Sequence, residues 1–388
     1  MLITSDLPAM TSPIMVNDGA ADRVQKLTEV FEKHRGEKHL VVLHDYPDPD
    51  AISAAFAHRL ISAEYDIDVD IVYSGKISNS QNIALVNLLN IGLIPYEDRI
   101  VLDQYEGAVY VDNQGGSNNT ISNAIESAGI PVVIVVDHHE DQGDLDSEYS
   151  DIRKVGSTAT IYARYIEEGL LRLKRGQKEH VAVATALMHG ILIDTEGFVK
   201  GDLEDFHSAA YLSQFRDAEL LEHIMNQSWS KQVMDVIRRA LGNRMVVENL
   251  SIAGIGYLRS EDRDAIPQAA EFLKKEENVH TAIVYGIVRN GEQDEILTGS
   301  MRTSKVTLDP DDFIKEVFGA GPDGRYYGGG KHMAGSFTIP LGFLSGNLTE
   351  TYAEQKWQVF DKQVKAKVFA RLGVNIDGRV TQPSVSNN

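Results

Sequence analysis

The sequence predicts an α/β protein in which a parallel sheet with helices on both faces is followed by a smaller α+β domain. Three observations lead to this class. The chain has 388 residues, and single hydrophobic cores stop growing at roughly 250–300 residues, so two domains are expected. Short apolar runs alternate with helical spacing in the first half, and strand patterns return after a long helical stretch.

Four buried strands are expected in the first half, because each run is short, bounded and rich in β-branched side chains. They span residues 39–43, 70–73, 108–111 and 131–136. Helical spacing occurs between strands, for example at 51–64 and 82–89. This alternation predicts βαβ units and therefore a parallel sheet.

The second half changes from a helical pattern to a mixed one. Residues 157–242 are almost wholly helical in spacing and end in a long segment, 217–241, suited to connect two domains. A helix is then expected near 267–275, and strands at 245–247, 252–257, 281–288 and 295–301. Asn290-Gly291 is a typical hairpin turn between the last two strands, so an α+β module is predicted.

The composition excludes several kinds of chemistry. The chain has no cysteine, which leaves oxygen and imidazole as metal ligands. With 37 Lys and Arg against 57 Asp and Glu, the formal charge is −20, so we expect no long duplex nucleic acid as a partner. No apolar run approaches the ~18 to 20 residues of a membrane span and no leader follows Met1, so we expect a cytoplasmic protein without a membrane partner.

One histidine and three aspartates follow the first predicted strand: His44, Asp45, Asp48 and Asp50. Ligands of an open parallel sheet bind outside the carboxyl ends of its strands, and two prolines stiffen this loop. The alternative is an acidic turn in which Asp50 caps the following helix.

Aspartate or histidine recurs at the ends of three further elements. Asp112 closes the third strand, Asp137, His138 and His139 close the fourth, and Asp194 ends a helical segment. Four such placements are hard to attribute to turns, whereas a pair of divalent ions needs about this many ligands. The two histidines could merely cap backbone groups, but Asp137 beside them could orient a ring N–H group. We therefore favour a metal site.

In order and spacing these residues resemble the motifs of the DHH phosphoesterase superfamily, named after the triplet Asp137-His138-His139. The first motif is present as His44-x-x-Pro47-Asp48-x-Asp50-Ala51, the second as Asp112 and the fourth as Asp194-Thr195. Two flanking features also match, at residues 73–76 with Asn82 and at 156–160. The segment 328–335 resembles the Gly-Gly-Gly-His box of the DHH-associated domain in the RecJ-like and nanoRNase-like branch.

The resemblance implies a role for each matched residue. Two manganese-type ions would be bound, with Asp112 bridging them. The implied ligands of the first ion are His44, Asp48 and Asp112, and those of the second are Asp50, Asp112, His138 and Asp194. His139 would lie beside the scissile phosphate, so Asp137 and His139 are the implied catalytic pair.

The glycine box suggests how a substrate phosphate could be held. Backbone N–H groups of Gly328, Gly329 and Gly330 could approach a phosphate without obstruction by Cβ atoms. Positive groups for it are expected from Lys331, His332 and Arg302. A lone triple glycine is more often a flexible turn, and a lone arginine more often forms a surface ion pair.

Two positions depart from the common pattern of the family. Tyr46 stands where Asn is frequent, and Lys331 is inserted between the third glycine and the histidine. The first departure leaves the implied ligands intact. The second leaves the register of the glycine box open.

The expected chemistry is phosphoester hydrolysis. Two divalent ions about 3.5–4 Å apart can share a water and lower its pKa, so we expect a metal-bridging hydroxide to attack phosphorus. His139 would neutralise phosphoryl charge or protonate the leaving group. Mn²⁺ suits an oxygen-rich site with some imidazole, and Mg²⁺ or Co²⁺ could substitute.

The patterns and the resemblance together predict the domain organisation. Residues 1–35 would be an N-terminal extension, 36–228 the DHH catalytic domain, 229–245 a connector helix or linker, 246–370 the DHH-associated substrate-binding domain, and 371–388 a mobile tail. The active site would lie in the cleft between the two domains.

Among the activities of the superfamily, the chain most resembles nanoRNase/pAp phosphatases. The expected reaction is hydrolysis of short oligonucleotides or dinucleotides, such as pApA, to mononucleotides, and removal of the 3′-phosphate of pAp is a further option. The alternative is a phosphodiesterase of cyclic di-AMP or another cyclic dinucleotide. A nucleotide-binding regulator without turnover is the alternative of another class, and a homodimer is expected from the family alone.

Overall fold

The computed structural model describes residues 20–374 except 78, 97–99, 116–119, 144, 291–293, 332 and 347–348. The chain divides into two compact units, Met1–Gln227 and Ser228–Asn388. Each unit has its own sheet and its own hydrophobic core.

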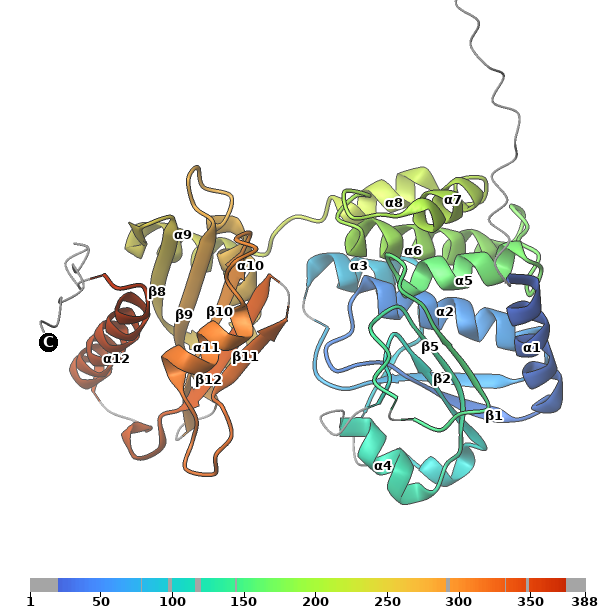
Figure 1. Ribbon diagram of the computed structural model, residues 1–388, viewed down its shortest axis with the longest axis horizontal. Helices are drawn as coiled ribbons and strands as arrows, with labels where there is room; N and C mark the ends of the chain where they lie inside the picture. The colour runs from blue at the N-terminus through green and yellow to red at the C-terminus, as the bar shows by residue number, and fades with distance from the viewer. Residues whose placement is uncertain are drawn as a thin grey trace, which may run out of the picture. The chain divides into compact units, whose positions relative to one another are not determined.

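The first unit contains a parallel sheet whose strand order is β3-β2-β1-β4-β5-β6 in the described residues. Figure 1 labels its strands β1, β2 and β5. The strands are β1 (Lys38–Val42), β2 (Asp68–Tyr73), β3 (Ile94–Pro95), β4 (Gly107–Val111), β5 (Val132–Asp137) and β6 (Tyr149–Ile152). The four predicted strands correspond to β1, β2, β4 and β5, so the predicted parallel sheet is confirmed. The order of winding reverses between β1 and β4, which makes their carboxyl ends a topological switch point.

Helices cover both faces of this sheet, as predicted. They are α1 (Ala20–Lys33), α2 (Pro49–Ala63), α3 (Ser80–Leu88), α4 (Thr120–Ala128), α5 (Thr158–Glu167), α6 (Lys178–Asp194), α7 (Leu203–Leu212) and α8 (Ala218–Met225). Alternation along β1 separates the two cores: Val41 packs in the core that contains α2 and α6, whereas Leu40 and Val42 pack in the core that contains α4.

The long helix expected over 217–241 is two helices, α8 and α9 (Lys231–Asn243). Each begins at a side-chain cap, because Asp217 accepts the N–H of Leu220 and Ser230 accepts the N–H of Val233. Helical spacing alone did not reveal this second start. The predicted connector, 229–245, contains α9. Several residues of α9, among them Val236, are buried in a core of the second unit.

The second unit is built on a mixed sheet of strand order β11-β12-β10-β9-β8-β7 in the described residues. The strands are β7 (Met245–Val247), β8 (Leu250–Arg259), β9 (Thr281–Asn290), β10 (Asp294–Thr303), β11 (Gly328–Lys331) and β12 (Ala334–Pro340), and the helices that follow α9 are α10 (Ala265–Leu273), α11 (Pro310–Phe318) and α12 (Glu350–Arg371). β8 and β9 are parallel, and the other neighbours are antiparallel. Across the described residues, no helix is long and apolar enough to cross a membrane.

The glycine segment is a strand rather than the predicted loop. Gly328, Gly329 and Gly330 pair with β12, and a Cβ atom at Gly328 would lie 2.1 Å from the carbonyl oxygen of Ser336. The N–H of Gly330 donates to Oδ1 of Asp311 at 3.0 Å. Close packing against β12 and α11 therefore accounts for these glycines. His332 lies outside the described residues, as do Gly291 and Glu292 of the predicted hairpin turn.

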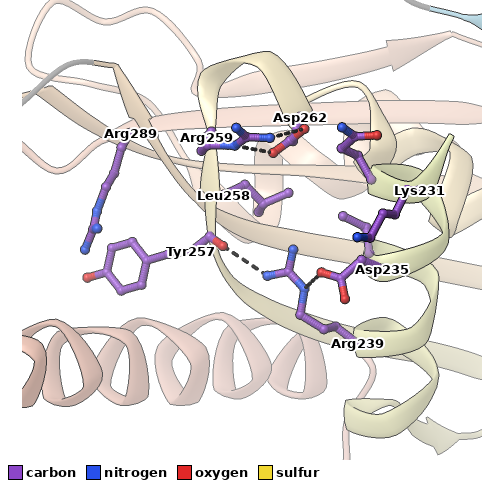
Figure 2. Close-up of a pocket in the computed structure, with 10 residues that line it drawn as sticks. Lys231, Asp235, Arg239, Tyr257, Leu258, Arg259, Asp262 and Arg289 are labelled. Atoms are coloured by element: carbon purple, nitrogen blue, oxygen red, sulfur yellow. Dashed lines mark hydrogen bonds and ion pairs between the residues drawn. The ribbon is translucent and has the colours of Figure 1, made fainter.

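A pocket of about 650 Å³ lies in the second unit between α9 and β8 (Figure 2). Its arginines are paired with carboxylates: Arg239 with Asp235 at 3.1 Å and Arg259 with Asp262 at 2.9 Å. None of the predicted site residues lines this pocket. Arg289 also lines the pocket and lies 3.2 Å from Glu295. The pocket is therefore lined by ion-paired arginines and not by the predicted ligands.

Candidate metal centre

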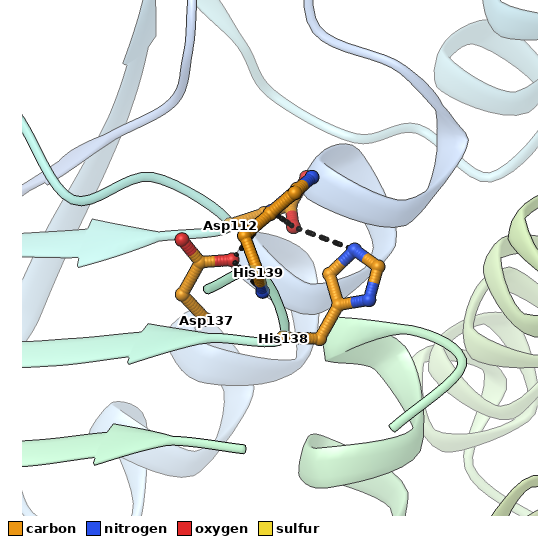
Figure 3. A group of neighbouring side chains, drawn as sticks. All are labelled: Asp112, Asp137, His138 and His139. Atoms are coloured by element: carbon orange, nitrogen blue, oxygen red, sulfur yellow. Dashed lines mark hydrogen bonds and ion pairs between the residues drawn. The ribbon is translucent and has the colours of Figure 1, made fainter. Parts of the chain in front are cut away.

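The predicted ligands of the first unit gather at the carboxyl ends of β1, β4 and β5. His44 lies two residues after β1, Asp112 follows β4, and Asp137 ends β5 immediately before His138 and His139 (Figure 3). This is the switch point of the sheet, where open α/β proteins bind their ligands.

One group of side chains surrounds His44. Its Nε2 atom lies 3.9 Å from Oδ1 of Asp48 and 3.6 Å from Oδ2 of Asp112. The donor atoms of these three residues lie close enough together to hold one cation. Asp48 also caps α2, because its carboxylate accepts the backbone N–H groups of Asp50 and Ala51. The alternative role proposed for Asp50, capping that helix, is therefore wrong.

A second group surrounds His138. Its Nε2 atom lies 3.4 Å from Oδ2 of Asp194, 3.6 Å from Oδ1 of Asp112 and 3.9 Å from Oδ2 of Asp50. Asp112 thus presents one carboxylate oxygen to each histidine. Its backbone adopts a left-handed conformation with φ of 53°, which a short polar residue tolerates better than most.

The orientation of both histidines suits metal binding. Nδ1 of His44 lies 2.9 Å from the carbonyl oxygen of Asp45, and Nδ1 of His138 lies 3.1 Å from that of Val155. A carbonyl oxygen only accepts, so Nδ1 of each ring carries a proton, and Nε2 is the atom that faces the carboxylates and could bind a cation. Nε2 of His138 is buried and makes no hydrogen bond within the described chain.

The distances also fit a shared cation better than direct hydrogen bonds. Donor atoms bound to one ion at about 2.0–2.3 Å lie roughly 3–4 Å apart, which is the range found around both histidines. The residues present therefore fit divalent cations. Carboxylate and imidazole donors are suitable ligands for such ions.

The electrostatics of the cluster point in the same direction. Burial and the neighbouring carboxylates of Asp48 and Asp112 raise the pKa of Asp194 to about 8. Burial and the charges of Asp112, Asp194 and Asp48 also raise the pKa of Asp50 well above its usual range. Without a cation, these carboxyl groups oppose one another's ionisation. Bound divalent cations would reverse that preference.

The start of α5 holds two of the carboxylates in place. Backbone N–H groups of Thr158 and Ala159 each donate to the carboxylate of Asp50 at 2.7 Å. The hydroxyl of Thr158 donates to Oδ1 of Asp112 at 2.9 Å. This segment matches a family motif, but Thr158 was not among the predicted site residues, because nothing in its spacing shows which side chain its hydroxyl meets.

Asp137 and His139 form a directed pair beside the ligand groups. Nδ1 of His139 lies 2.8 Å from Oδ1 of Asp137, and the His139 side chain is 47% exposed. Burial opposes the ionisation of Asp137, but its hydrogen bonds from His139 and Gln114 outweigh burial and lower its pKa. Gln114 donates to Oδ2 of Asp137 at 2.8 Å. Gln114 was not predicted from the sequence, because its place two residues after Asp112 was the only indication that it belongs to the site.

The predicted substrate residues lie in the second unit. Arg302 of β10 pairs with Ala334 of β12, which pairs with Lys331 of β11. The register therefore places Arg302 and Lys331 in one row across three strands. Burial lowers the pKa of Arg302, and its guanidinium donates to Oγ of Ser300 at 2.8 Å.

The fold and the two linked ligand groups define an α/β protein with a candidate metal centre at a switch point. Comparison with known families gives a more specific assignment: the DHH family, N-terminal domain, matches residues 38–191. The chain belongs to the DHH family of phosphoesterases, which confirms the resemblance found in the sequence. The matched range contains every predicted ligand except Asp194.

Similar proteins support the family assignment. An uncharacterized protein of Methanocaldococcus jannaschii is 35% identical over 356 residues, which are 91% of this chain and 67% of that protein. A probable manganese-dependent inorganic pyrophosphatase of Bacillus mycoides is 29% identical over 161 residues, 41% of this chain, and the match spans about half (48%) of that relative. An exopolyphosphatase-related protein from Bacteroides fragilis shares the fold, with a TM-score of 0.64 and 18% identity over 92% of this chain and 98% of that one.

Proposed function

We propose that the chain hydrolyses the phosphoester bond of short oligonucleotides, including dinucleotides such as pApA, to mononucleotides. The observation that carries the proposal is the carboxylate of Asp112, which faces His44 with one oxygen and His138 with the other. A carboxylate shared in this way suits a pair of cations, and paired cations are a recurring means of in-line displacement at phosphorus.

Two divalent cations are proposed, with manganese as the first choice because a relative is named as manganese-dependent. His44, Asp48 and Asp112 would hold one, and Asp50, Asp112, His138 and Asp194 the other. When bound, the cations supply Lewis acidity, which polarises the phosphoryl oxygens and makes water a stronger nucleophile at neutral pH.

His139 is the proposed proton donor to the leaving oxygen. Its ring is half-exposed, and its Nδ1–H group is held by Asp137. The proton is proposed to leave from Nε2, the other ring nitrogen. Asp137 is a positioning residue in this scheme, because it acts through His139. Its buried negative charge stabilises the imidazolium that donates the proton.

The size limit on the substrate is proposed from charge. The chain carries a formal charge of −20, so a long polyanion is repelled except where cations gather. Arg302 and the Lys331 position share a row of the second sheet, and this row is the proposed contact for a terminal phosphate. The same contact would serve the 3′-phosphate of pAp.

A second candidate is hydrolysis of inorganic pyrophosphate, favoured by the 29% identity to the pyrophosphatase relatives. That match covers less than half of this chain. Cyclic di-AMP hydrolysis requires the same chemistry at phosphorus, so the test must include it.

The experiment compares the rates at which the manganese-loaded protein hydrolyses pApA, pAp, cyclic di-AMP, pyrophosphate and a long single strand. We expect pApA to be hydrolysed fastest, and Asp112→Asn to abolish turnover. Faster hydrolysis of pyrophosphate or cyclic di-AMP would reassign the substrate. Nucleotide binding without any turnover would mean that the protein is a nucleotide-binding regulator and not an enzyme.

A further inference from the structure

Tyr46 has an unusual backbone conformation at the edge of the metal centre. Its φ angle is 59°, a left-handed conformation that Gly, Asn and Asp adopt far more readily than an aromatic residue. A bulky residue there is strained, and such strain is often found at functional sites. The conformation therefore indicates a functional role for the Tyr46 side chain.

One face of the Tyr46 ring covers Gly75. A Cβ atom at Gly75 would lie 2.8, 2.9 and 3.0 Å from Cδ1, Cε1 and Cγ of the ring. The near equality of these distances places that point over the face of the ring, because an edge-on approach would leave the neighbouring ring atoms distinctly farther away. Only a glycine leaves room for the ring in this position.

The other face of the ring is open. Tyr46 is 58% exposed, and within the described residues no aromatic or cationic side chain stacks on it. Its backbone is fixed, because the N–H of Tyr46 donates to the carbonyl oxygen of Ser74 at 3.0 Å. The ring is thus a supported flat surface that faces solvent.

This surface lies next to the proposed reaction centre. Tyr46 is two residues from both His44 and Asp48, and two peptide units span at most about 7 Å between Cα atoms. The loop that carries the ring also carries these two proposed ligands, so a base attached to a phosphate held by the cations would extend over the same loop.

We propose that Tyr46, supported by Gly75, is a nucleobase subsite that stacks on the base attached to the scissile phosphate. The inference rests on the proposed function and deepens it, because it explains preference for a nucleotide over an inorganic phosphate. Stacking on an aromatic ring is tolerant of base identity and strengthens binding about five- to hundredfold per base. We therefore expect the subsite to accept any nucleobase and not one particular base.

The test compares binding of AMP and ribose 5-phosphate to the manganese-loaded full chain by calorimetry. The two ligands share the phosphate and differ in the base. We expect AMP to bind about tenfold tighter or more in the wild type and in Tyr46→Phe, and the ratio to fall close to one in Tyr46→Asn. Thermal unfolding of Tyr46→Asn should occur at an unchanged or higher temperature, because Asn tolerates the left-handed conformation.

Glu248→Asn is the matched control. Glu248 also has a left-handed backbone, with φ of 48°, in the turn between β7 and β8 of the second unit, and its replacement should leave the ligand ratio unchanged. A Tyr46→Asn variant that keeps the wild-type ratio overturns the subsite, whether or not the chain hydrolyses nucleotides. If AMP binds more tightly than ribose 5-phosphate through Tyr46 but no substrate is hydrolysed, the subsite is supported and the proposed hydrolysis is contradicted.

Discussion

The hydroxyl of Thr158 donates a hydrogen bond of 2.9 Å to Oδ1 of Asp112. The same oxygen is the one that faces His138. Thr158 therefore fixes the carboxylate that links the two ligand groups, from the first turn of a helix whose backbone also binds Asp50. Partners of this kind orient metal ligands and tune their affinity.

The first prediction concerns this hydrogen bond. Thr158→Val keeps the size of the side chain but removes the donor, so manganese should bind about 10- to 100-fold more weakly. Titration calorimetry with Mn²⁺ measures the change, and Thr158→Ser, which keeps the hydroxyl, should bind almost as the wild type does. Equal weakening in both variants would mean that packing rather than the hydrogen bond matters.

The second prediction is that the metal-free protein becomes less stable as the pH rises. In the fold, the pKa of Asp194 is raised to about 8 by burial and by Asp48 and Asp112, against about 4 in an unfolded chain. Between these values the folded state binds more protons than the unfolded state, so the free energy of unfolding falls as the pH rises.

His44 acts in the same direction. Burial opposes its protonation, but the nearby carboxylates of Asp48 and Asp112 outweigh burial and raise its pKa to about 9. Its stabilising contribution is complete below about pH 6.5, its usual value, and is lost as the pH rises toward 9.

Urea unfolding of the metal-free chain at pH 6.5 and 8 measures this effect. Burial lowers the pKa of His58 to about 3 and of His189 to about 4, so these residues oppose the trend only below about pH 6.5. At one fixed concentration, Mn²⁺ should add most stability at pH 8, where its ligands are deprotonated, and the gain is about 2.7 kcal/mol where that concentration is 100 times the dissociation constant. Metal-free stability that increases from pH 6.5 to pH 8 would contradict the prediction.

The sequence was sufficient to predict that acidic and imidazole side chains gather at the carboxyl ends of the strands. Buried strands of a parallel sheet are continuous apolar runs, so a polar residue such as Asp112 or Asp137 marks the end of a strand. The structure brings His44 and His138 into two groups joined by Asp112. The placement of Asp and His at the ends of elements, together with the family motif, was enough for that expectation.

Other features depend on contacts that spacing does not encode. Gln114 and Thr158 hold carboxylates across distances of 23 and 46 residues, and many side chains of these types occur at surfaces. The strand at Gly328–Lys331 was not predicted, and triple glycine has low strand propensity. Its pairing with β12 and close packing on Asp311 override that propensity.

The third prediction separates a positioning residue from a metal ligand. Asp137 accepts hydrogen bonds from His139 through Oδ1 and from Gln114 through Oδ2. Asp137→Asn replaces one acceptor by a donor, so His139 or Gln114 loses its bond. We expect kcat to fall by about 10²–10⁴-fold, with manganese affinity changed far less than in Asp112→Asn.

Single-turnover rates and manganese titrations on the same preparations measure both quantities. Gln114→Ala is the graded control, because it removes one of the bonds to Asp137 and should lower the rate less. Loss of manganese affinity equal to that of Asp112→Asn would make Asp137 a ligand, since its carboxylate lies in the same group of donor atoms.

The fourth prediction asks whether the glycine strand serves packing or substrate. A Cβ atom at Gly330 would lie 2.6 Å from the carbonyl oxygen of Ala334 and 2.8 Å from Cβ of Pro310, so Gly330→Ala should destabilise the second unit by about 1–3 kcal/mol. Gly242→Ala is the matched control: no atom lies within 4 Å of its Cβ position in α9, and helix propensity should stabilise it by up to about 1 kcal/mol. Urea unfolding measures both changes. An unchanged unfolding midpoint in Gly330→Ala, combined with weaker binding of AMP, would instead assign this glycine to the substrate.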